Sequence, residues 1–185
     1  TELESDLKKS ISSLEKTSGE KVLGFRAPFF SISKHNLDKF HIIGKYFKYD
    51  SSIFPAKTPL YGISDAPRFP YHFSSKTPLK DYSNGDLFEI PPATLKIPLY
   101  GNVPIAGGFY FRFLPIPLIK HGINKLNKSG YPAMCYIHPK DLDEKMPRID
   151  SYSWHYYFNL KNGKKRFESI LKNFKFCSVR EMYSF

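Results

Sequence analysis

The sequence predicts an α/β protein in which amphipathic helices alternate with short apolar strands. The first observation is the order of the two patterns, which runs helix, strand, helix, strand, loop, strand, loop, helix, strand, loop, helix, strand. The second is that two apolar runs end in one polar side chain, Arg26 or His138, with a proline close behind. Strands that alternate with helices tend to pair in parallel, so we expect a parallel sheet or barrel.

Four segments have the periodicity of amphipathic helices. In Thr1–Ser18, Thr1 and Glu4 have the spacing of a capping box and Gly19 ends the helix. Its buried face consists of Leu3, Leu7, Ile11 and Leu14. The second helix begins at Ser33, with an apolar stripe of Leu37, Phe40, Ile43 and Phe47. The other two helices are expected at Ile116–Leu126 and Lys164–Asn173.

Five apolar runs are short enough to be buried strands. They are Lys21–Phe25, Tyr49–Phe54, Leu87–Ile90, Ala133–Ile137 and Phe174–Val179. Between the second and third runs, residues 55–85 are rich in proline, serine and aromatic side chains and have no sustained period. A stretch of this length without regular structure is uncommon and is typical of a functional or capping loop. We therefore expect a single domain over residues 1–185, with long irregular capping loops.

The composition excludes several classes of protein. Aromatic residues make up 17% of the 185 residues and 15 residues are prolines, which excludes a disordered chain and a simple helical bundle. No apolar run approaches the roughly 20 residues of a membrane-spanning helix, so no transmembrane segment is expected. Cys135 and Cys177 lie in apolar runs, where buried thiols are expected, and no further Cys or His at short spacing completes a metal pair.

The formal net charge is +11, from 28 Lys and Arg residues against 17 Asp and Glu residues. Such a charge raises nucleic acid, an anionic polysaccharide or an anionic membrane surface as partners. The basic residues are scattered, however, and no basic run, zinc finger or aromatic RNA-binding signature is present. A basic nucleic-acid-binding module is therefore an alternative that rests on net charge alone, and no nucleic acid is expected as a partner.

Three polar side chains lie at or near expected strand ends, where α/β folds bind ligands. Arg26 can hold a carboxylate through its planar fork, or be a surface charge. His138 is the best candidate for a proton donor or acceptor, and a core histidine satisfied by the backbone is the alternative. Asp50 could pair with His138, form a salt bridge with Arg26, or cap a turn into Ser51-Ser52. The residues alone indicate parts of an acid–base site without a nucleophile or a metal site.

A series of ordered motifs along the chain carries a family resemblance. The motifs are Phe25-Arg26-Ala27-Pro28-Phe29-Phe30, Tyr49-Asp50-Ser51-Ser52-Ile53-Phe54-Pro55, Tyr61-Gly62, Glu89-Ile90-Pro91, Gly107-Gly108-Phe109-Tyr110-Phe111-Arg112, Tyr136-Ile137-His138-Pro139, Asp143 with Pro147-Arg148, and His155-Tyr156 with Asn159-Leu160. Together they resemble the polysaccharide deacetylases of the NodB type, and more closely the branch found with exopolysaccharide synthesis loci. The resemblance implies a partial distorted (β/α) barrel, with a family-specific C-terminal extension from about Gly85 to Phe185.

The resemblance also implies an activity and roles for particular residues. Enzymes of this family hydrolyse N- or O-acetyl groups of sugar polymers, so we expect a hydrolase acting on the non-peptide C–N bonds of a polysaccharide, with N-acetyl groups preferred. By motif, Arg26 resembles the arginine that orients the catalytic base, His138 the general acid, and Asp50 the carboxylate that tunes that histidine. The substrate-binding residues that it suggests are Pro28, Phe29, Gly107, Gly108, Tyr110, Arg112 and His155. For His155, packing among its aromatic neighbours is the alternative.

The chain departs from the family in its metal site. The family holds a divalent metal, expected to be zinc, through one Asp and two His, and a second Asp is the base. The Thr-Phe-Asp-Asp and His-x-x-x-His motifs that carry these groups do not occur in the sequence. We therefore expect the isolated chain to bind no metal and to be inactive, because one histidine acid cannot replace a metal that polarises the acetyl carbonyl and activates water.

Three further expectations follow. A non-catalytic carbohydrate-binding remnant of the same fold is the alternative function. A barrel without its first strands exposes sheet edges, so we expect self-association through them. The resemblance leans towards the cytoplasm or the membrane periphery as the location, and the residues of this chain do not decide it.

Overall fold

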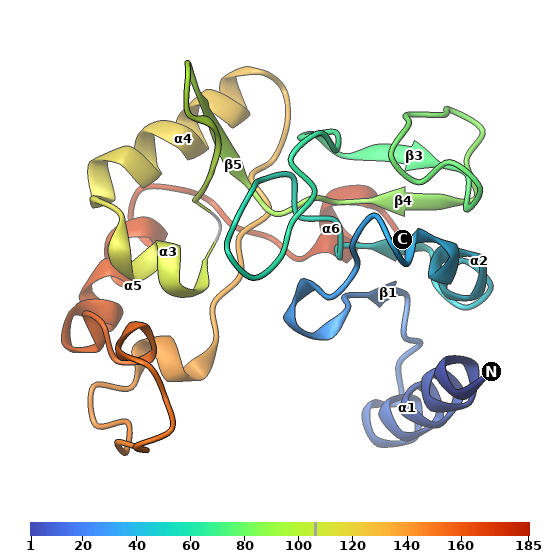
Figure 1. The fold of residues 1–185 in the computed structure, drawn as a ribbon, viewed down its shortest axis with the longest axis horizontal. Helices are drawn as coiled ribbons and strands as arrows, with labels where there is room; N and C mark the ends of the chain where they lie inside the picture. Colours follow the sequence, from blue (N-terminus) through green and yellow to red (C-terminus); the bar gives the residue numbers. More distant parts are fainter. Residues whose placement is uncertain (106) are drawn as a thin grey trace. The chain divides into compact units, whose positions relative to one another are not determined.

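The computed structural model describes residues 1–105 and 107–185, which divide into two compact units. Unit 1 comprises Thr1–Pro91 and unit 2 comprises Pro92–Phe185. Each unit combines helices with short strands (Figure 1), so the mixed α/β class is confirmed. The expectation of a single domain with a family-specific extension from about Gly85 stays a prediction.

Unit 1 begins with helix α1, Glu2–Ser18, as its periodicity predicts. The Thr1 hydroxyl accepts a hydrogen bond from the Glu4 backbone N–H at 3.3 Å. Gly19 ends the helix in the left-handed conformation, with a φ of 72°. Of the four residues expected on the buried face, Leu7 is buried and Leu3 and Ile11 are half-buried, but Leu14 is 56% exposed, so the prediction is wrong for Leu14. Local sequence thus fixes both ends of this helix.

A four-stranded sheet follows α1, with the strand order β1-β2-β4-β3. Its strands are β1 Gly24–Phe25, β2 Tyr49–Asp50, β3 Tyr71–Phe73 and β4 Leu87–Glu89. Strands β1, β2 and β4 run parallel, and β3 pairs antiparallel with β4. The register places Phe25 opposite Asp50 and Asp50 opposite Glu89. Because parallel strands end at the same edge of a sheet, the carboxyl ends of β1, β2 and β4 lie together.

Two strands of unit 1 are shorter than the sequence suggests. Only two residues of Lys21–Phe25 and two of Tyr49–Phe54 pair in the sheet. The second run leaves the sheet because the Asp50 carboxylate accepts hydrogen bonds from the backbone and side chain of Ser52, which turns the chain. Side-chain chemistry at the strand end therefore overrides the apolar run that follows it.

The helix expected after Ser33 is also shorter than predicted. It consists of a 3₁₀ turn at Leu37–Lys39 and the single turn α2 at Phe40–Ile43. Phe40 is fully buried, and its ring packs edge-on against Phe73 with 5.0 Å between ring centroids. The buried core around it includes Leu7, Ala27, Ile32, Ile43, Phe47, Ile53, Ile63, Tyr71 and Leu87. The apolar stripe was thus correctly assigned to the core, although only part of it is helical.

Unit 2 opens with an antiparallel hairpin that the sequence pattern did not predict (Figure 1). Strand β5, Thr94–Ile97, pairs with β6, Gly101–Pro104. The helices in the described part of unit 2 are α3 Gly108–Phe113, α4 Ile116–Lys128, α5 Gly163–Leu171 and α6 Val179–Tyr183. Helices α4 and α5 confirm two predicted helices to within two residues at either end. Over the ranges that the structure describes, no helix has both the length and the apolar character that crossing a membrane requires.

Two strands expected in unit 2 do not form within the described residues. In the run Ala133–Ile137, Tyr136 makes an isolated parallel bridge to Gly107 and the rest lies outside the sheets. The run Phe174–Val179 is not paired either. Ser178 instead caps α6: its hydroxyl accepts from the Glu181 N–H at 3.2 Å, and its own N–H donates to Glu181 Oε2 at 2.7 Å. The described residues form no closed barrel, so a NodB barrel stays a prediction.

Candidate functional site

The carboxyl ends of β1, β2 and β4 form a polar site in unit 1. Arg26 follows β1, Asp50 ends β2 and Glu89 ends β4. Asp50 and Glu89 are fully buried, whereas Arg26 is half-buried. This is the edge at which parallel α/β sheets bind ligands. The structure thus brings Arg26 and Asp50 together and adds Glu89.

Arg26 is fixed by the segment that follows β2. Its Nε donates to the Ser51 carbonyl at 2.9 Å, and its Nη2 donates to Ser51 Oγ at 2.6 Å. Ser51 Oγ in turn donates to the Ile90 carbonyl at 2.6 Å, just beyond β4. The guanidinium carbon lies 5.3 Å from the centroid of the Phe30 ring. The three parallel strand ends therefore hold Arg26 in one orientation.

The Asp50 carboxylate caps the turn that follows its own strand. Oδ1 accepts from the Ser52 N–H and Oδ2 from the Ser52 hydroxyl, both at 2.8 Å. Ser52 Oγ also accepts from the Ala27 N–H at 2.8 Å, which ties this turn to the Arg26 segment. Of the three roles considered for Asp50, turn capping is the one that these bonds confirm. His138 lies in unit 2, so its tuning by Asp50 stays a prediction.

Glu89 is the member of this site that the sequence reasoning missed. Its Oε1 accepts from the Ile53 N–H at 3.1 Å. Its Oε2 is buried, and no N–H or neutral O–H group among the described residues donates to it. A glutamate that ends an apolar strand just before Pro91-Pro92 was the available signal, because it repeats the polar strand end seen at Arg26 and His138.

Burial disfavours the ionised forms of both Asp50 and Glu89. Burial raises the pKa of Asp50, and hydrogen bonds from Glu89 and Ser52 and the charge of Arg26 oppose that shift. Burial, the charge of Asp50 and the hydrogen bond between the two side chains raise the pKa of Glu89 well above its usual value. Two buried carboxyl groups this close do not both ionise. The pKa of Glu89 is the more strongly raised, so its neutral form is favoured, and the charge of Arg26 acts against that shift in both groups.

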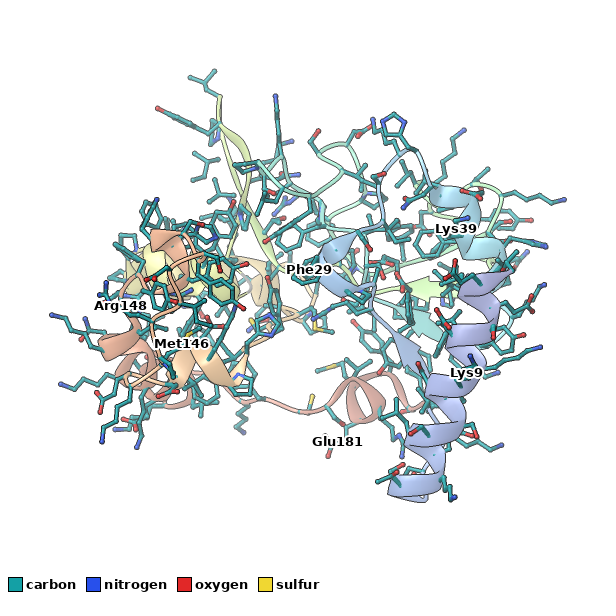
Figure 2. The ribbon with its side chains drawn as sticks, turned by 60° about the horizontal axis from the view of Figure 1, so that its bottom comes forward. Lys9, Phe29, Lys39, Met146, Arg148 and Glu181 are labelled. Atoms are coloured by element: carbon teal, nitrogen blue, oxygen red, sulfur yellow. The ribbon has the colours of Figure 1, made fainter. Side chains whose placement is uncertain are left out.

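Pro28 and Phe29 lie on the surface directly after Arg26. They belong to a 3₁₀ turn, Pro28–Phe30, that begins with the proline. Figure 2 labels Phe29 on this turn. Phe29 is 87% exposed and has a φ of 57°, a left-handed conformation that bulky residues rarely adopt. Phe30 has a φ of 52° but is buried. Backbone strain next to a polar strand end is typical of functional sites.

In unit 2, Arg112 joins separate segments of the chain from the interior. It is 2% exposed, and its Nε donates to Asp141 Oδ1 at 2.9 Å. Its other nitrogens donate to the backbone carbonyls of His155, at 3.1 Å, and Phe158. The Arg112 carbonyl accepts from the Asn159 side chain at 2.8 Å. These bonds place Arg112 as a positioning residue behind the surface.

His138 is exposed and is held by the same aspartate. The His138 backbone N–H donates to Asp141 Oδ2 at 3.1 Å, and the His138 backbone carbonyl accepts from the Asp141 backbone N–H at 2.9 Å. The imidazole lies edge-on to the Tyr136 ring, with 5.6 Å between centroids. Asp141 thus connects His138 to Arg112, and the imidazole can be reached from solvent.

The two glycines proposed for substrate binding lie where α3 begins. A Cβ at Gly107 would come within 1.8 Å of the Tyr136 carbonyl oxygen. Gly108 has a φ of 57°, and its Cβ would meet the Tyr136 hydroxyl at 3.3 Å. Tyr110 on α3 is half-buried, with its ring edge-on to Phe109. The glycines therefore let α3 approach the segment that leads to His138.

Around His155 the structure gathers aromatic side chains that we call the unit-2 aromatic surface. Its members are Phe109, Phe113, Trp154, His155 and Phe158. The Phe109 ring lies 5.1 Å from Phe113, 5.7 Å from Trp154 and 6.0 Å from His155, between centroids. Phe113 is 51% exposed and Trp154 is 65% exposed. His155 lies within this surface, where it can pack against its aromatic neighbours or face a ligand, so both predictions for it stay open.

Sequence reasoning did not select the other aromatic members of this surface. The available signal was spacing: Phe109 and Phe113 are four residues apart, as are Trp154 and Phe158. On helical turns this spacing puts side chains on one face. The two pairs come from distant parts of the chain, so only the fold shows that they meet.

Unit 2 also contains an apolar cavity of about 270 Å³. Its lining includes Ile119 and Ile123 of α4, Phe167 and Ile170 of α5, and Cys135. Burial raises the pKa of the Cys135 thiol to about 12, so the thiol is neutral. This cavity offers a sugar few polar partners and is not part of the candidate site.

The residues present do not fit the metal of the deacetylase family. Within 1–105 and 107–185, no three or more His, Cys, Asp or Glu side chains come together as a set that could hold a metal ion. Asp50 and Glu89 are two buried carboxyl groups with raised pKa values, and His138 and His155 belong to no ligand set among the described residues.

Comparison with known proteins identifies a family. The family described as "Domain of unknown function (DUF3473)" matches residues 51–184, and the chain belongs to it. DUF3473 is a domain found at the C-terminus of proteins of the polysaccharide deacetylase family. Glu89, Arg112, His138 and the unit-2 aromatic surface lie within the matched residues, whereas Arg26 and Asp50 precede them. No curated protein and no solved structure matches the chain.

Proposed function

We propose that this chain is part of a polysaccharide deacetylase of the NodB type, in which it binds the sugar polymer and supplies the general acid. The observation that carries the proposal is the unit-2 aromatic surface, with Phe113 and Trp154 largely exposed. Membership of a domain family found in deacetylase proteins and the ordered deacetylase-like motifs support it.

Exposed aromatic rings suit a sugar polymer because a pyranose ring has an apolar face and a polar edge. Trp154 and Phe113 offer flat apolar faces, and a cluster of this kind on a soluble surface usually marks a binding site. His155, whose Nδ1 lies 3.1 Å from Ser153 Oγ, adds a polar group beside them. Lys140, 4.5 Å from the Tyr156 ring centroid, adds a cation nearby. Rings with adjacent polar groups can bind both the face and the edge of a sugar.

The chemical step that this chain's own residues can perform is proton transfer. In hydrolysis of an N-acetyl group, water adds to the acetyl carbon, the C–N bond breaks, and the amine nitrogen takes up a proton. Histidine is the side chain that gives a proton most readily near neutral pH. The His138 imidazole is exposed and its backbone is held by Asp141, so we assign His138 the protonation of the leaving nitrogen. Arg26 is assigned the orientation of the base, as the resemblance implies.

The binding part of the proposal is tested with the 185-residue chain. Oligomers of β-1,4-linked N-acetylglucosamine are titrated into the protein, and affinity is measured by calorimetry and by chemical-shift changes of the Trp154 indole N–H. Trp154→Ala should lower the affinity about tenfold or more, because a stacking aromatic is removed. Tyr82→Ala is the matched control, since Tyr82 is 52% exposed in unit 1. No binding by the wild type, or equal binding by Trp154→Ala, contradicts the proposal.

The catalytic part is tested on the gene and on acetate release. Sequencing the coding DNA upstream of Thr1 shows whether the reading frame contains the Thr-Phe-Asp-Asp and His-x-x-x-His motifs. If it does, the protein encoded by the whole frame should release acetate, and His138→Ala should abolish release while sugar affinity is kept. A start codon just upstream instead favours the non-catalytic carbohydrate-binding remnant. Metal-dependent acetate release by the 185-residue chain alone would contradict our expectation that it is inactive.

A further inference from the structure

We propose that the β5–β6 hairpin docks unit 2 on an anionic lipid bilayer. The tip of this hairpin, Pro98-Leu99-Tyr100, is apolar and fully in solvent. Leu99 is 105% exposed and Tyr100 is 84% exposed. The tip stands clear of the helices in Figure 1. Soluble surfaces rarely present adjacent large apolar side chains in this way unless they have a partner.

The backbone conformation of the tip supports a role for Leu99. Pro98 and Leu99 are the central residues of a turn closed by a hydrogen bond from the Tyr100 N–H to the Ile97 carbonyl at 3.2 Å. Leu99 has a φ of 68°, a conformation usually taken by glycine or asparagine at this position of a turn. Here the strained residue is a leucine whose side chain is wholly exposed, so packing within the chain does not explain it.

The base of the hairpin is packed into the core of unit 2. Thr94 and Leu95 are buried in β5. Ile105, just beyond β6, packs on α4, where its Cδ1 lies 2.5 Å from the position that a Cβ of Gly122 would take. The absence of a side chain at Gly122 lets α4 and the hairpin approach closely. The tip therefore projects from a packed base.

The charge around the hairpin favours an anionic partner. Unit 2 contains 15 Lys and Arg residues and 6 Asp and Glu residues, whereas unit 1 contains 13 and 11. No acidic residue occurs between Glu89 and Asp141, the stretch that contains the hairpin and α4. Lys96 on β5 and Lys125 and Lys128 on α4 are exposed. The positive charge of this protein is thus concentrated in the unit that presents the apolar tip.

An anionic bilayer fits both features better than an anionic polysaccharide does. Basic residues are attracted to the negative headgroups, and an apolar tip can enter the headgroup and acyl boundary. Tyrosine is among the residues enriched at that depth of a membrane. A leucine side chain, by contrast, offers a hydrated polysaccharide no flat ring on which to stack. The combination of Leu99, Tyr100 and the exposed lysines of an acid-free stretch of sequence therefore points to lipid.

The test is co-sedimentation of the 185-residue chain with vesicles. One set consists of phosphatidylcholine and the other of an equal mixture of phosphatidylcholine and phosphatidylglycerol. The wild type should bind the anionic vesicles and be released by high salt, because the attraction of exposed charges is screened. Leu99→Asn with Tyr100→Ser should lower the affinity about tenfold or more, since the inserted apolar area is lost. Lys125→Glu with Lys128→Glu should lower it by about tenfold or more as well.

Controls separate docking from folding and from sugar binding. Asparagine accepts the left-handed conformation at position 99, so the tip variant should keep the melting temperature of the wild type. Leu60→Asn is the matched control, because Leu60 is 80% exposed in unit 1, and it should bind vesicles like the wild type. No binding to anionic vesicles, or unchanged binding by the tip variant, overturns the proposal. Loss of oligosaccharide affinity by the tip variant, with vesicle binding kept, overturns it in favour of a polysaccharide contact.

Discussion

Asp50 and Glu89 lie opposite each other in the parallel strands β2 and β4, both are fully buried, and burial raises the pKa of both carboxyl groups. Arg26 lies close enough to lower the pKa of both carboxyl groups. A cation beside two buried carboxyl groups that favour their neutral forms limits the uncompensated charge inside the protein. The edge of the sheet from which Arg26 and Phe29 project is thus built on this buried pair.

The raised pKa of Glu89 predicts that the stability of the protein depends on pH. Glu89 has a folded pKa above its unfolded value of about 4.3, so its contribution is complete below that value and is lost as the pH rises towards the folded pKa. Glu89→Gln keeps the shape, and its amide can donate to Asp50 without titrating. The unfolding free energy of Glu89→Gln relative to the wild type should therefore rise with pH, by up to about 1.4 kcal/mol per pH unit across that window.

Urea unfolding between pH 4 and pH 8 measures this difference. The exposed variant Glu2→Gln is the control, and its stability should follow the wild-type curve in parallel. A Glu89→Gln curve that is also parallel to the wild type would show that folding does not raise the pKa of Glu89. That result would contradict the prediction.

Phe29 and Phe30 provide a matched pair for testing backbone strain. Both have positive φ, but Phe29 is 87% exposed whereas Phe30 is 7% exposed. Phe29→Asn should raise the unfolding free energy by about 1 kcal/mol, because asparagine tolerates this conformation. Phe30→Asn should lower it by about 3 kcal/mol, since the Phe30 ring packs on Phe54 and Tyr61.

Thermal and urea unfolding of the two variants check this prediction, and oligosaccharide titration extends it. If Phe29 binds substrate, Phe29→Asn should be more stable and bind sugar less tightly, as strained functional positions often behave. If Phe29→Asn instead has a lower unfolding free energy than the wild type, the positive φ of Phe29 does not destabilise the protein. Unchanged sugar affinity would remove Phe29 from the binding site.

The parts of the fold that the sequence predicted are those fixed by local interactions. Helix α1 follows from a capping residue, an apolar face and a terminal glycine, all within 19 residues. The run Phe174–Val179 failed because an apolar run does not distinguish a strand from a loop, and Ser178 with Glu181 formed a helix cap within it. The hairpin was missed because Leu99 occupies a turn position where glycine or asparagine is the usual sequence signal of a hairpin.

The candidate site was predictable to a similar extent. Arg26, Asp50 and His138 stand out because each is a polar residue at or near the end of an apolar run. Glu89 follows the same pattern, but its partner Asp50 is 39 residues away, and only the register of β2 and β4 joins them. Likewise, the role of Arg112 depends on Asp141 and on carbonyls of residues 155 and 158. Such long-range partners are set by packing, which a pattern of residues does not contain.

Arg112 and Asp141 predict a large loss of stability when their buried pair is broken. Both side chains are almost completely buried, at 2% and 0% exposed. Arg112→Ala leaves the Asp141 carboxylate without its cation, so the unfolding free energy should fall by about 3–5 kcal/mol. Lys34→Ala breaks the exposed pair with Asp65 and should cost about 1 kcal/mol or less.

Urea unfolding of both variants measures the contrast, and spectra of the His138 imidazole show whether its segment moves. Because Asp141 also binds the His138 backbone, Arg112→Ala should shift the His138 ring resonances, whereas Lys34→Ala should not. Equal and small losses in the two variants would show that Arg112 does not hold unit 2 together.

Gly107 and Gly101 separate two reasons for having a glycine. Gly107 has a φ of 165°, an extended conformation open to any residue, but an added Cβ would lie 1.8 Å from the Tyr136 carbonyl oxygen. Gly101 has a φ of 81° and nothing within 4 Å of such a Cβ. Gly101→Ala should therefore cost about 1 kcal/mol, from conformation alone. Gly107→Ala should cost about 3 kcal/mol or more, because backbone must move.

We expect Gly107→Ala to weaken sugar binding more than Gly101→Ala, just as it should lower the stability more. Gly107 bridges to Tyr136, two residues before His138, and stands next to α3, which carries Phe109 and Tyr110. A displaced α3 moves the unit-2 aromatic surface relative to His138, so Gly107→Ala should weaken oligosaccharide binding more than Gly101→Ala does. Thermal unfolding and sugar titration of both variants measure this. Equal stability losses would mean that Tyr136 yields easily, and equal affinities would mean that the Gly107 contact does not position the sugar-binding surface.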